Sequence, residues 1–316
     1  MTTGGAGNAA EQARRARSDR RTRVTVVVAL VANLVIAVAK AVGGFVASSP
    51  SLLSEAAHSV ADSLNEVFLL TALHRSRRPP DRWHPFGYGK ERWFWSLLAA
   101  IGIFVMGACF SFFQAVEALH STESVSVPRY VAGIAVLAVA LLAEGSSLLR
   151  ALYQARRQGG TAHDPAHRTV IAEDAAAVVG VVLAMTGMGL HLATGNPAWE
   201  AAASLTIGLL LVYVAYRLAR ESRDQLIGAA IDPELRTAMR CMLDGQPEID
   251  NVAELLTMRL GADSALVAAR IDLVPGLDSE EVETVAERIK KAVADRWPQA
   301  DQVFLDITEA PPRPGR

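Results

Sequence analysis

The first two-thirds of the chain alternate long apolar runs with short polar connections. Six runs are long enough to cross a hydrocarbon layer of about 30 Å as helices, which takes roughly 20 residues. They lie at 24–47, 51–73, 93–119, 129–153, 169–192 and 199–219. This pattern predicts a bundle of six transmembrane helices over residues 24–222. The second and fifth runs are the least hydrophobic, which is typical of helices that face protein or water rather than lipid.

After residue 223 the pattern becomes that of a small soluble domain. DPELRTAMRCMLDG and DSEEVETVAERIKKAVADRWP have the periodicity of amphipathic helices. NVAELLTMRLG, SALVAARIDLVP and DQVFLDITE are typical of strands. The order αββαβ predicts a cytoplasmic α+β domain over 223–310, with its helices on one face of an open sheet. We expect it to mediate homodimerisation rather than metal sensing, because no histidine follows His191.

Basic residues predict how the bundle is oriented. Arginine and lysine are concentrated before the first run, between the second and third, between the fourth and fifth, and after the sixth. The other connections, at 48–50, 120–128 and 191–198, contain neither residue. The positive-inside rule then places both termini in the cytoplasm. We expect a multi-pass protein of the plasma membrane.

The two chain ends are expected to lie outside the folded parts. Residues 1–23 are rich in glycine, alanine and arginine and are expected to form a disordered basic tail, and 311–316 a short second tail. The N-terminal segment is not predicted to be a cleavable signal peptide, because the apolar run that follows it is long enough to span a membrane.

Composition narrows the possible functions. The 316 residues are 51% hydrophobic, and the mean hydropathy of +0.23 is high for a soluble protein. The formal net charge of −2 averages two different regions. Cys109 and Cys241 give no disulfide framework. Without a glycine-rich phosphate loop or an HExxH motif, we expect no ATPase and no metalloenzyme, and we expect no nucleic-acid partner.

The second run carries the most informative pair of residues. His58 and Asp62 are four positions apart, which places both side chains on one helical face about 6 Å apart. An imidazole and a carboxylate so placed can ligate a divalent cation such as Zn²⁺. Ionisable groups within a membrane are costly and are often functional. The alternative is that the two residues only pair with each other or with a neighbouring helix.

The fifth run carries two adjacent acids, Glu173 and Asp174. Neighbouring residues on a helix point about 100° apart, so both carboxylates cannot aim equally well at one ion. Acids so near lipid need cationic or hydrogen-bonding company. A cation shared with His58 and Asp62 would supply it. The residues therefore predict one divalent-cation site between the second and fifth runs.

Other polar residues in the runs leave alternatives open. Lys40 can snorkel only near a helix end and otherwise faces the bundle. Asn65 could orient Asp62. Glu66 is interpreted as a solvated residue at the helix end in preference to part of an ion path. Glu144 fits an interhelical hydrogen bond and an ion path equally well, and Glu200 is expected at the membrane interface.

Three motifs together resemble the cation diffusion facilitator family over nearly the whole chain. They are SLLSEAAHSVAD in the second run, HPFGYGKER in the following connection and EDAAAVVG in the fifth run. The resemblance implies that His58, Asp62 and Asp174 are metal ligands. The ED pair in the fifth run is similar to the zinc-transporter-9-like branch of the family.

The sequence also departs from the family's usual pattern. Val170 stands where the fifth helix usually has histidine or aspartate, and Glu173, on nearly the same face, could replace that ligand. Tyr88 stands where many members carry a second loop histidine. For this reason we interpret Asp81 and His84 as parts of a structural turn rather than of a metal site.

The resemblance implies a homodimeric secondary transporter that moves a divalent cation out of the cytoplasm against inward proton flow. Metal and protons would compete for the same donors, and the site would open to each side in turn. Zn²⁺ is favoured because an imidazole is present, while Mn²⁺, Fe²⁺, Co²⁺ and Ni²⁺ stay open. The alternative from another class is a membrane scaffold or regulator that keeps the fold and transports nothing.

Overall fold

The computed structural model describes residues 27, 30–120, 126–157 and 165–309, with 154–157 and 165–170 described as backbone only. The predicted disordered tail at 1–23 and the predicted short tail at 311–316 lie outside these residues. The chain divides into two compact units. Of the described residues, those up to 71 and those from 95 to 220 form one unit, and those from 72 to 94 and from 221 to 309 form the other.

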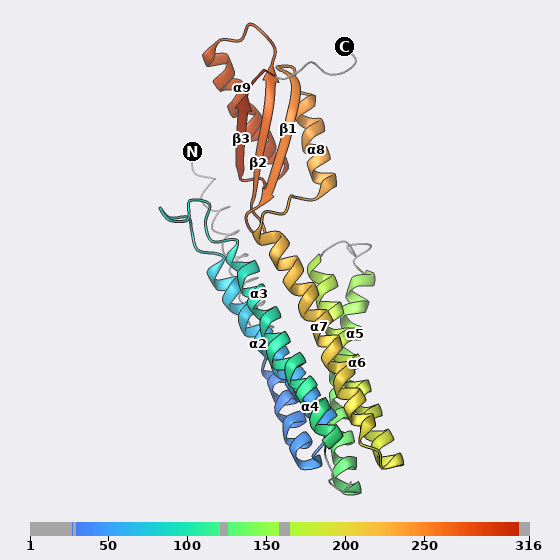
Figure 1. Ribbon diagram of the computed structural model, residues 1–316. Coiled ribbons are helices and arrows are strands. Elements are labelled where there is room, and N and C mark those ends of the chain that lie inside the picture. Colours follow the sequence, from blue (N-terminus) through green and yellow to red (C-terminus); the bar gives the residue numbers. More distant parts are fainter. Residues whose placement is uncertain (1–26, 28–29, 121–125, 158–164, 310–316) are drawn as a thin grey trace, which may run out of the picture. The chain divides into compact units, whose positions relative to one another are not determined.

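The first unit is a bundle of long helices that run alongside one another (Figure 1). The helices that form it, wholly or in part, are Leu30–Ala47, α2 (Pro50–Arg75), α3 (Glu91–Gly102), η1 (Ile103–Cys109), α4 (Phe110–His120), α5 (Val127–Arg157), α6 (Pro165–Thr194) and α7 (Ala198–Leu226). The π-helical segment η1 joins α3 and α4 into one helix over 91–120.

Within the described residues, five helical segments are long and apolar enough to cross a membrane. They are Leu30–Ala47, Glu91–His120, Val127–Tyr153, Ile171–Thr194 and Ala198–Leu226. The predicted second span, α2, has sufficient length but carries four ionisable residues in its interior, namely Glu55, His58, Asp62 and Glu66. Such a helix is stable in a membrane only when its polar face is turned toward protein or water.

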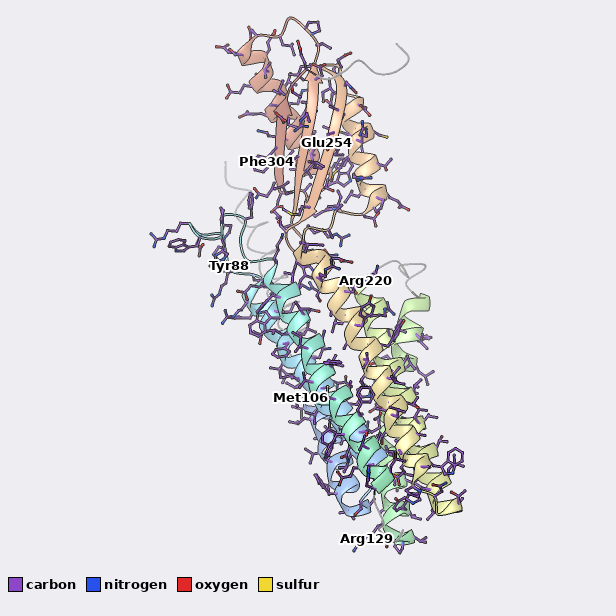
Figure 2. The ribbon with its side chains drawn as sticks, in the orientation of Figure 1. Tyr88, Met106, Arg129, Arg220, Glu254 and Phe304 are labelled. Carbon is purple, nitrogen blue, oxygen red and sulfur yellow. The ribbon has the colours of Figure 1, made fainter. Side chains whose placement is uncertain are left out.

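The surface of the bundle is apolar, as expected for a membrane protein. Large exposed side chains include Phe45, Leu142 and Leu149, and Met106 of η1 lies on this surface (Figure 2). The interior is filled by a separate cluster that contains Leu52, Ile103, Leu137, Met188, Ile207 and Leu211. Apolar side chains both inside and outside are typical of a bundle surrounded by lipid.

The C-terminal part of the second unit is a three-stranded sheet with two helices. Its elements are α8 (Pro233–Asp244), β1 (Ile249–Arg259), β2 (Ala265–Leu273), α9 (Ser279–Arg296) and β3 (Gln302–Ile307). β2 lies in the centre, antiparallel to β1 and parallel to β3. Asp278 starts α9 by accepting hydrogen bonds from the backbone of Glu280 and Glu281, and the Glu281 side chain closes the capping box.

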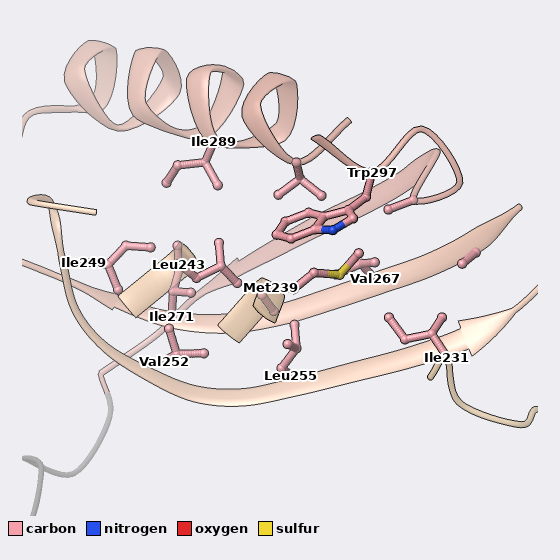
Figure 3. Close-up of a cluster of buried hydrophobic side chains, with 14 of the residues drawn as sticks. Ile231, Met239, Leu243, Ile249, Val252, Leu255, Val267, Ile271, Ile289 and Trp297 are labelled. Carbon is pink, nitrogen blue, oxygen red and sulfur yellow. The ribbon is translucent and has the colours of Figure 1, made fainter. Parts of the chain in front are cut away.

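The core of this domain lies on one face of the sheet. Every second residue of β2, from Ala265 to Ile271, is buried, as the two-residue repeat of a strand requires. Figure 3 shows Met239 and Leu243 of α8 with Ile289 of α9 in the same cluster. Both helices therefore cover this face, and the opposite face is open.

Candidate metal centre

A stripe of polar residues follows one face of α2. Ser51, Glu55, His58, Asp62 and Glu66 recur at intervals of three or four positions, which places them one above another on a helix. The Ser51, Glu55 and His58 side chains are buried inside the bundle. The polar face of α2 therefore points inward, and this orientation is why so polar a helix is compatible with the bundle.

His58 lies between two carboxylates of its own helix. Its Nδ1 is 3.4 Å from Glu55 Oε1, and its Nε2 is 3.5 Å from Asp62 Oδ2. The expectation that His58 and Asp62 lie on one helical face is confirmed. When Nδ1 donates its proton to Glu55, the lone pair of Nε2 is available on the side of Asp62. A carboxylate behind a ligating imidazole is the usual way in which proteins orient such a ligand.

Gly180 lets the backbone of α6 lie against this pair. A Cβ atom at Gly180 would overlap the Glu55 carboxylate and would lie 3.3 Å from His58 Nδ1. Only glycine leaves room for both side chains at this crossing. The second and fifth predicted spans are thus in contact at the level of His58.

Glu173 and Asp174 follow on α6 and turn toward different neighbours. Asn65 Nδ2 of α2 donates to Glu173 Oε1 at 3.4 Å, whereas Ser147 Oγ of α5 donates to Asp174 Oδ2 at 3.0 Å. The divergence is the one expected of adjacent helical residues. Asn65, which we expected to orient Asp62, therefore contacts Glu173 instead.

The carboxylates of the two helices are close enough to interact electrostatically. The negative charge of Asp62 is close enough to repel the negative charges of three other carboxylates, those of Glu66, Glu173 and Asp174. Within the described part of the chain, however, no three His, Cys, Asp or Glu side chains are gathered tightly enough to hold a metal ion. The structure brings His58 and Asp62 together and places Glu173 and Asp174 on the facing helix. Convergence of all four on one ion stays a prediction.

Lys40 forms an ion-pair network directly behind Glu55. Its Nζ donates to Glu55 Oε2 at 2.7 Å, to Glu144 Oε1 at 2.7 Å and to Ser59 Oγ at 2.9 Å. Lys40 is only 1% exposed. The sequence left alternatives open for both residues. In the structure Lys40 faces the bundle rather than a helix end, and Glu144 makes an interhelical hydrogen bond. Glu55 thus links His58 to the buried ammonium group of Lys40. The sequence alone showed these residues only as charged positions within apolar runs and did not indicate that they are in contact.

The transmembrane part of the chain matches a known family. Residues 26–227 match the model of the cation efflux transmembrane domain. The chain belongs to the cation efflux family. This confirms the resemblance carried by the three sequence motifs.

Individual relatives in the cation efflux family differ in the metal that their names give. The chain is 32% identical over 235 residues to the proton-coupled zinc antiporter SLC30A9, mitochondrial, of Xenopus laevis, a match that covers 71% of this chain and 42% of that protein. It is 33% identical over 239 residues to metal tolerance protein C4 of Arabidopsis thaliana, covering 72% of this chain and 52% of that protein. The chain thus spans about half the length of these relatives. The manganese efflux system protein MneP of Bacillus subtilis is 24% identical over 290 residues, covering 88% of this chain and 93% of that protein.

Two further carboxylates, those of Glu66 and Glu200, are more buried than the sequence predicted. Glu66 is half-buried rather than solvated, and Asn33 Nδ2 of the first helix donates to its Oε1 at 2.8 Å. Glu200, expected at the membrane interface, is enclosed by neighbouring helices and is 1% exposed. Both corrections have one cause. Partners on other helices bury these side chains, and a single sequence does not indicate those partners.

The loop after α2 supports the interpretation of Asp81 as a turn residue. Asp81 Oδ1 accepts from the backbone nitrogen atoms of Trp83 and His84 at 2.9 and 2.8 Å, and Oδ2 accepts from the Tyr88 hydroxyl at 2.7 Å. The hydrogen bond from Tyr88, followed by that from the His84 backbone, lowers the pKa of Asp81 below its usual value. Both oxygen atoms of the Asp81 carboxylate thus accept hydrogen bonds from within the turn.

Replacing Gly180 by alanine tests the close approach of α6 to α2. The added Cβ displaces Glu55 and His58, so we expect metal flux to fall at least about tenfold, as when the support of a metal ligand is lost. Gly189→Ala on the same helix is the control, because a Cβ there meets nothing within 4 Å. Zinc uptake into proteoliposomes measures both variants, and equal flux in the two would contradict the packing role.

Proposed function

We propose that this protein exports a divalent cation, preferably Zn²⁺, from the cytoplasm in exchange for protons. The observation that carries the proposal is the position of His58. Its ring lies between Glu55 and Asp62, inside the bundle, where Gly180 brings α6 into contact with α2. Ionisable groups of this kind within a membrane domain mark the path of an ion.

The donors have distinct roles in this proposal. His58 Nε2 and the Asp62 carboxylate ligate the cation from α2, and Asp174 ligates it from α6, with Glu173 in place of the ligand absent at Val170. Glu55 accepts the Nδ1 proton of His58 and so keeps Nε2 free for the metal. A site with one nitrogen and several oxygen donors suits Zn²⁺ and also admits Mn²⁺, Fe²⁺, Co²⁺ or Ni²⁺.

Transport follows from competition between metal and protons. At the cytoplasmic side the deprotonated donors bind the cation, and at the other side protonation releases it. The site must open to each side in turn, with α2 as the sixth membrane-spanning helix and its polar stripe lining the path. The arginine-rich connections favour cytoplasmic termini, and we propose the plasma membrane as the location.

The open face of the C-terminal sheet supports the proposal of a homodimer. Leu256 of β1 and Phe304 of β3 are both half-exposed and lie in one row across the sheet, on either side of Ala268. The next row is ionic, because Arg270 pairs with Glu254 and Asp306. An apolar row beside a charged row is typical of a protein-contact surface.

The proposed activity makes the apparent metal affinity depend on pH. Protons and the cation compete for His58 and the carboxylates, so lowering the pH weakens binding. The apparent Kd should rise up to about tenfold per pH unit for each proton released on binding. Calorimetric titration of the purified protein with Zn²⁺ from pH 8 to pH 6 measures this slope. We expect His58→Ala to flatten it, and a parent protein with no slope would exclude proton competition.

Metal flux distinguishes the proposed exporter from a scaffold that transports nothing. The failure of the four predicted ligands to gather in this structure favours the scaffold. We expect purified protein in liposomes to move Zn²⁺ when a proton gradient is imposed and to stop when the gradient is collapsed. Competition by Mn²⁺, Fe²⁺, Co²⁺ and Ni²⁺ ranks the metals. Flux no greater than in empty liposomes for every metal would leave the scaffold as the better description.

A further inference from the structure

A second buried polar cluster surrounds Glu200. Its Oε1 accepts from the Tyr130 hydroxyl at 2.5 Å and from His191 Nδ1 at 2.8 Å. Its Oε2 accepts from the hydroxyls of Ser49 and Ser51, the latter at 3.0 Å. We call these five residues the Glu200 cluster. All five side chains are buried.

The Glu200 cluster holds the ends of several helices together. Ser49 and Ser51 lie at the junction between the first helix and α2, Tyr130 lies in the first turn of α5, His191 in the last turn of α6 and Glu200 in the first turn of α7. This is the end of the bundle whose connections, at 48–50, 120–128 and 191–198, contain no lysine or arginine. A pathway that releases a cation on this side must separate these helix ends.

Glu200 has one partner that can become positively charged. Among the described groups that bond to it, His191 and Tyr130 are titratable, while Ser49 and Ser51 are not. A buried carboxylate without a positive partner is costly, and a charge-assisted bond to an imidazolium is about twice as strong as a neutral one. One proton shared by His191 and Glu200 therefore stabilises the joined helix ends.

The cluster is continuous with the polar stripe of α2. Ser51 belongs to both, and the buried residues Ser54, Glu55 and His58 follow it on α2. His58 lies seven positions after Ser51 on the helix, or about 10 Å along the axis. The cluster is thus one end of a polar path that leads to the candidate metal centre.

We propose that His191 and Glu200 form a proton-binding site on the non-cytoplasmic side, and that proton uptake there closes this end of the bundle. The proposal rests on the proposed function, because it gives the proton a place outside the metal ligands. The proton comes from the non-cytoplasmic solution and binds the imidazole, which becomes an imidazolium paired with the carboxylate. Loss of that proton leaves a net negative buried cluster and favours opening.

Cysteine accessibility tests the proposal without any metal. Ser54→Cys, fully buried and one turn from Ser51, reports opening in a background that carries Cys109→Ser and Cys241→Ser. A membrane-impermeant thiosulfonate is added from the non-cytoplasmic side, and its rate is divided by that of an exposed reference cysteine, Glu117→Cys, at each pH. We expect the corrected rate to rise at least fivefold from pH 6 to pH 8.5.

Three variants separate a proton site from a merely structural cluster. Glu200→Gln and His191→Gln should label fast at both pH values, because neither retains the ion pair. Tyr130→Phe should label somewhat faster than the parent but keep the pH dependence, since it loses a donor and not the site. His120→Gln, an exposed histidine bonded to its own helix, should behave as the parent.

Failure of the proton site and failure of the proposed export give different results. A corrected labelling rate that is independent of pH in the parent overturns the proton site. So does pH dependence that survives in both Glu200→Gln and His191→Gln. If a variant does not fold, the parent and Tyr130→Phe profiles still decide the matter. Absence of metal flux alongside intact pH-dependent labelling overturns the export and leaves the proton site standing.

Discussion

We expect His58→Ala and Asp62→Asn each to reduce zinc flux more than about 100-fold. Both residues lie on the buried face of α2, and Nε2 of His58 points toward Asp62 at 3.5 Å. Because we propose both as direct ligands, removing either should cost more than the 10- to 100-fold typical of residues that only support a ligand. Initial zinc uptake into proteoliposomes, normalised to reconstituted protein, measures the loss.

Matched variants show whether this loss is specific. Ser63→Ala lies next to Asp62 on the same helix and removes only a bond to the Ser59 carbonyl, so its flux should equal that of the parent. On α6 we expect Asp174→Asn to lose more flux than Glu173→Gln, because the family resemblance assigns the ligand to Asp174. Parent-like flux in both His58→Ala and Asp62→Asn would mean that α2 holds no transported cation.

We expect Lys40→Met to destabilise the bundle by about 3–5 kcal/mol, the usual cost of leaving buried charges without their partner. The ammonium group lies 2.7 Å from both Glu55 and Glu144, and methionine fills a similar volume without a charge. The thermal midpoint of the detergent-solubilised protein should fall accordingly, and zinc flux should fall because Glu55 no longer orients His58.

A double variant isolates the electrostatic part of this effect. Lys40→Met combined with Glu144→Gln removes one of the two orphaned charges, so the midpoint should recover part of the loss. Recovery of stability without recovery of flux would indicate that Glu55 is held in place for His58 by the ammonium group itself. A Lys40→Met protein as stable as the parent would contradict the ion-pair network.

Features that repeat along the chain could be predicted from the sequence. The spacing of His58 and Asp62 placed them on one helical face, and the periodicity of DSEEVETVAERIKKAVADRWP predicted the helix that the structure has as α9. The apolar runs predicted long membrane helices, although α2 is too polar to qualify by composition alone. These inferences succeed because they depend on residues a few positions apart.

Contacts between distant helices could not be predicted in the same way. Lys40 and Glu144 are 104 positions apart, and Ser49 and Glu200 are 151 apart. Their proximity is set by how α5 and α7 pack against the first two helices. The same limit explains why Asn65 was assigned to Asp62, its helical neighbour, when its partner is Glu173 on α6.

Zinc K-edge X-ray absorption on the metal-loaded protein tests most directly whether one cation is held between α2 and α6. We predict one tightly bound Zn²⁺ per chain, with a single imidazole and otherwise oxygen ligands at about 2.0–2.2 Å. The imidazole signal should vanish in His58→Ala, and occupancy should fall in Asp174→Asn. Bound zinc with an unchanged imidazole signal in His58→Ala would place the cation elsewhere and contradict the account.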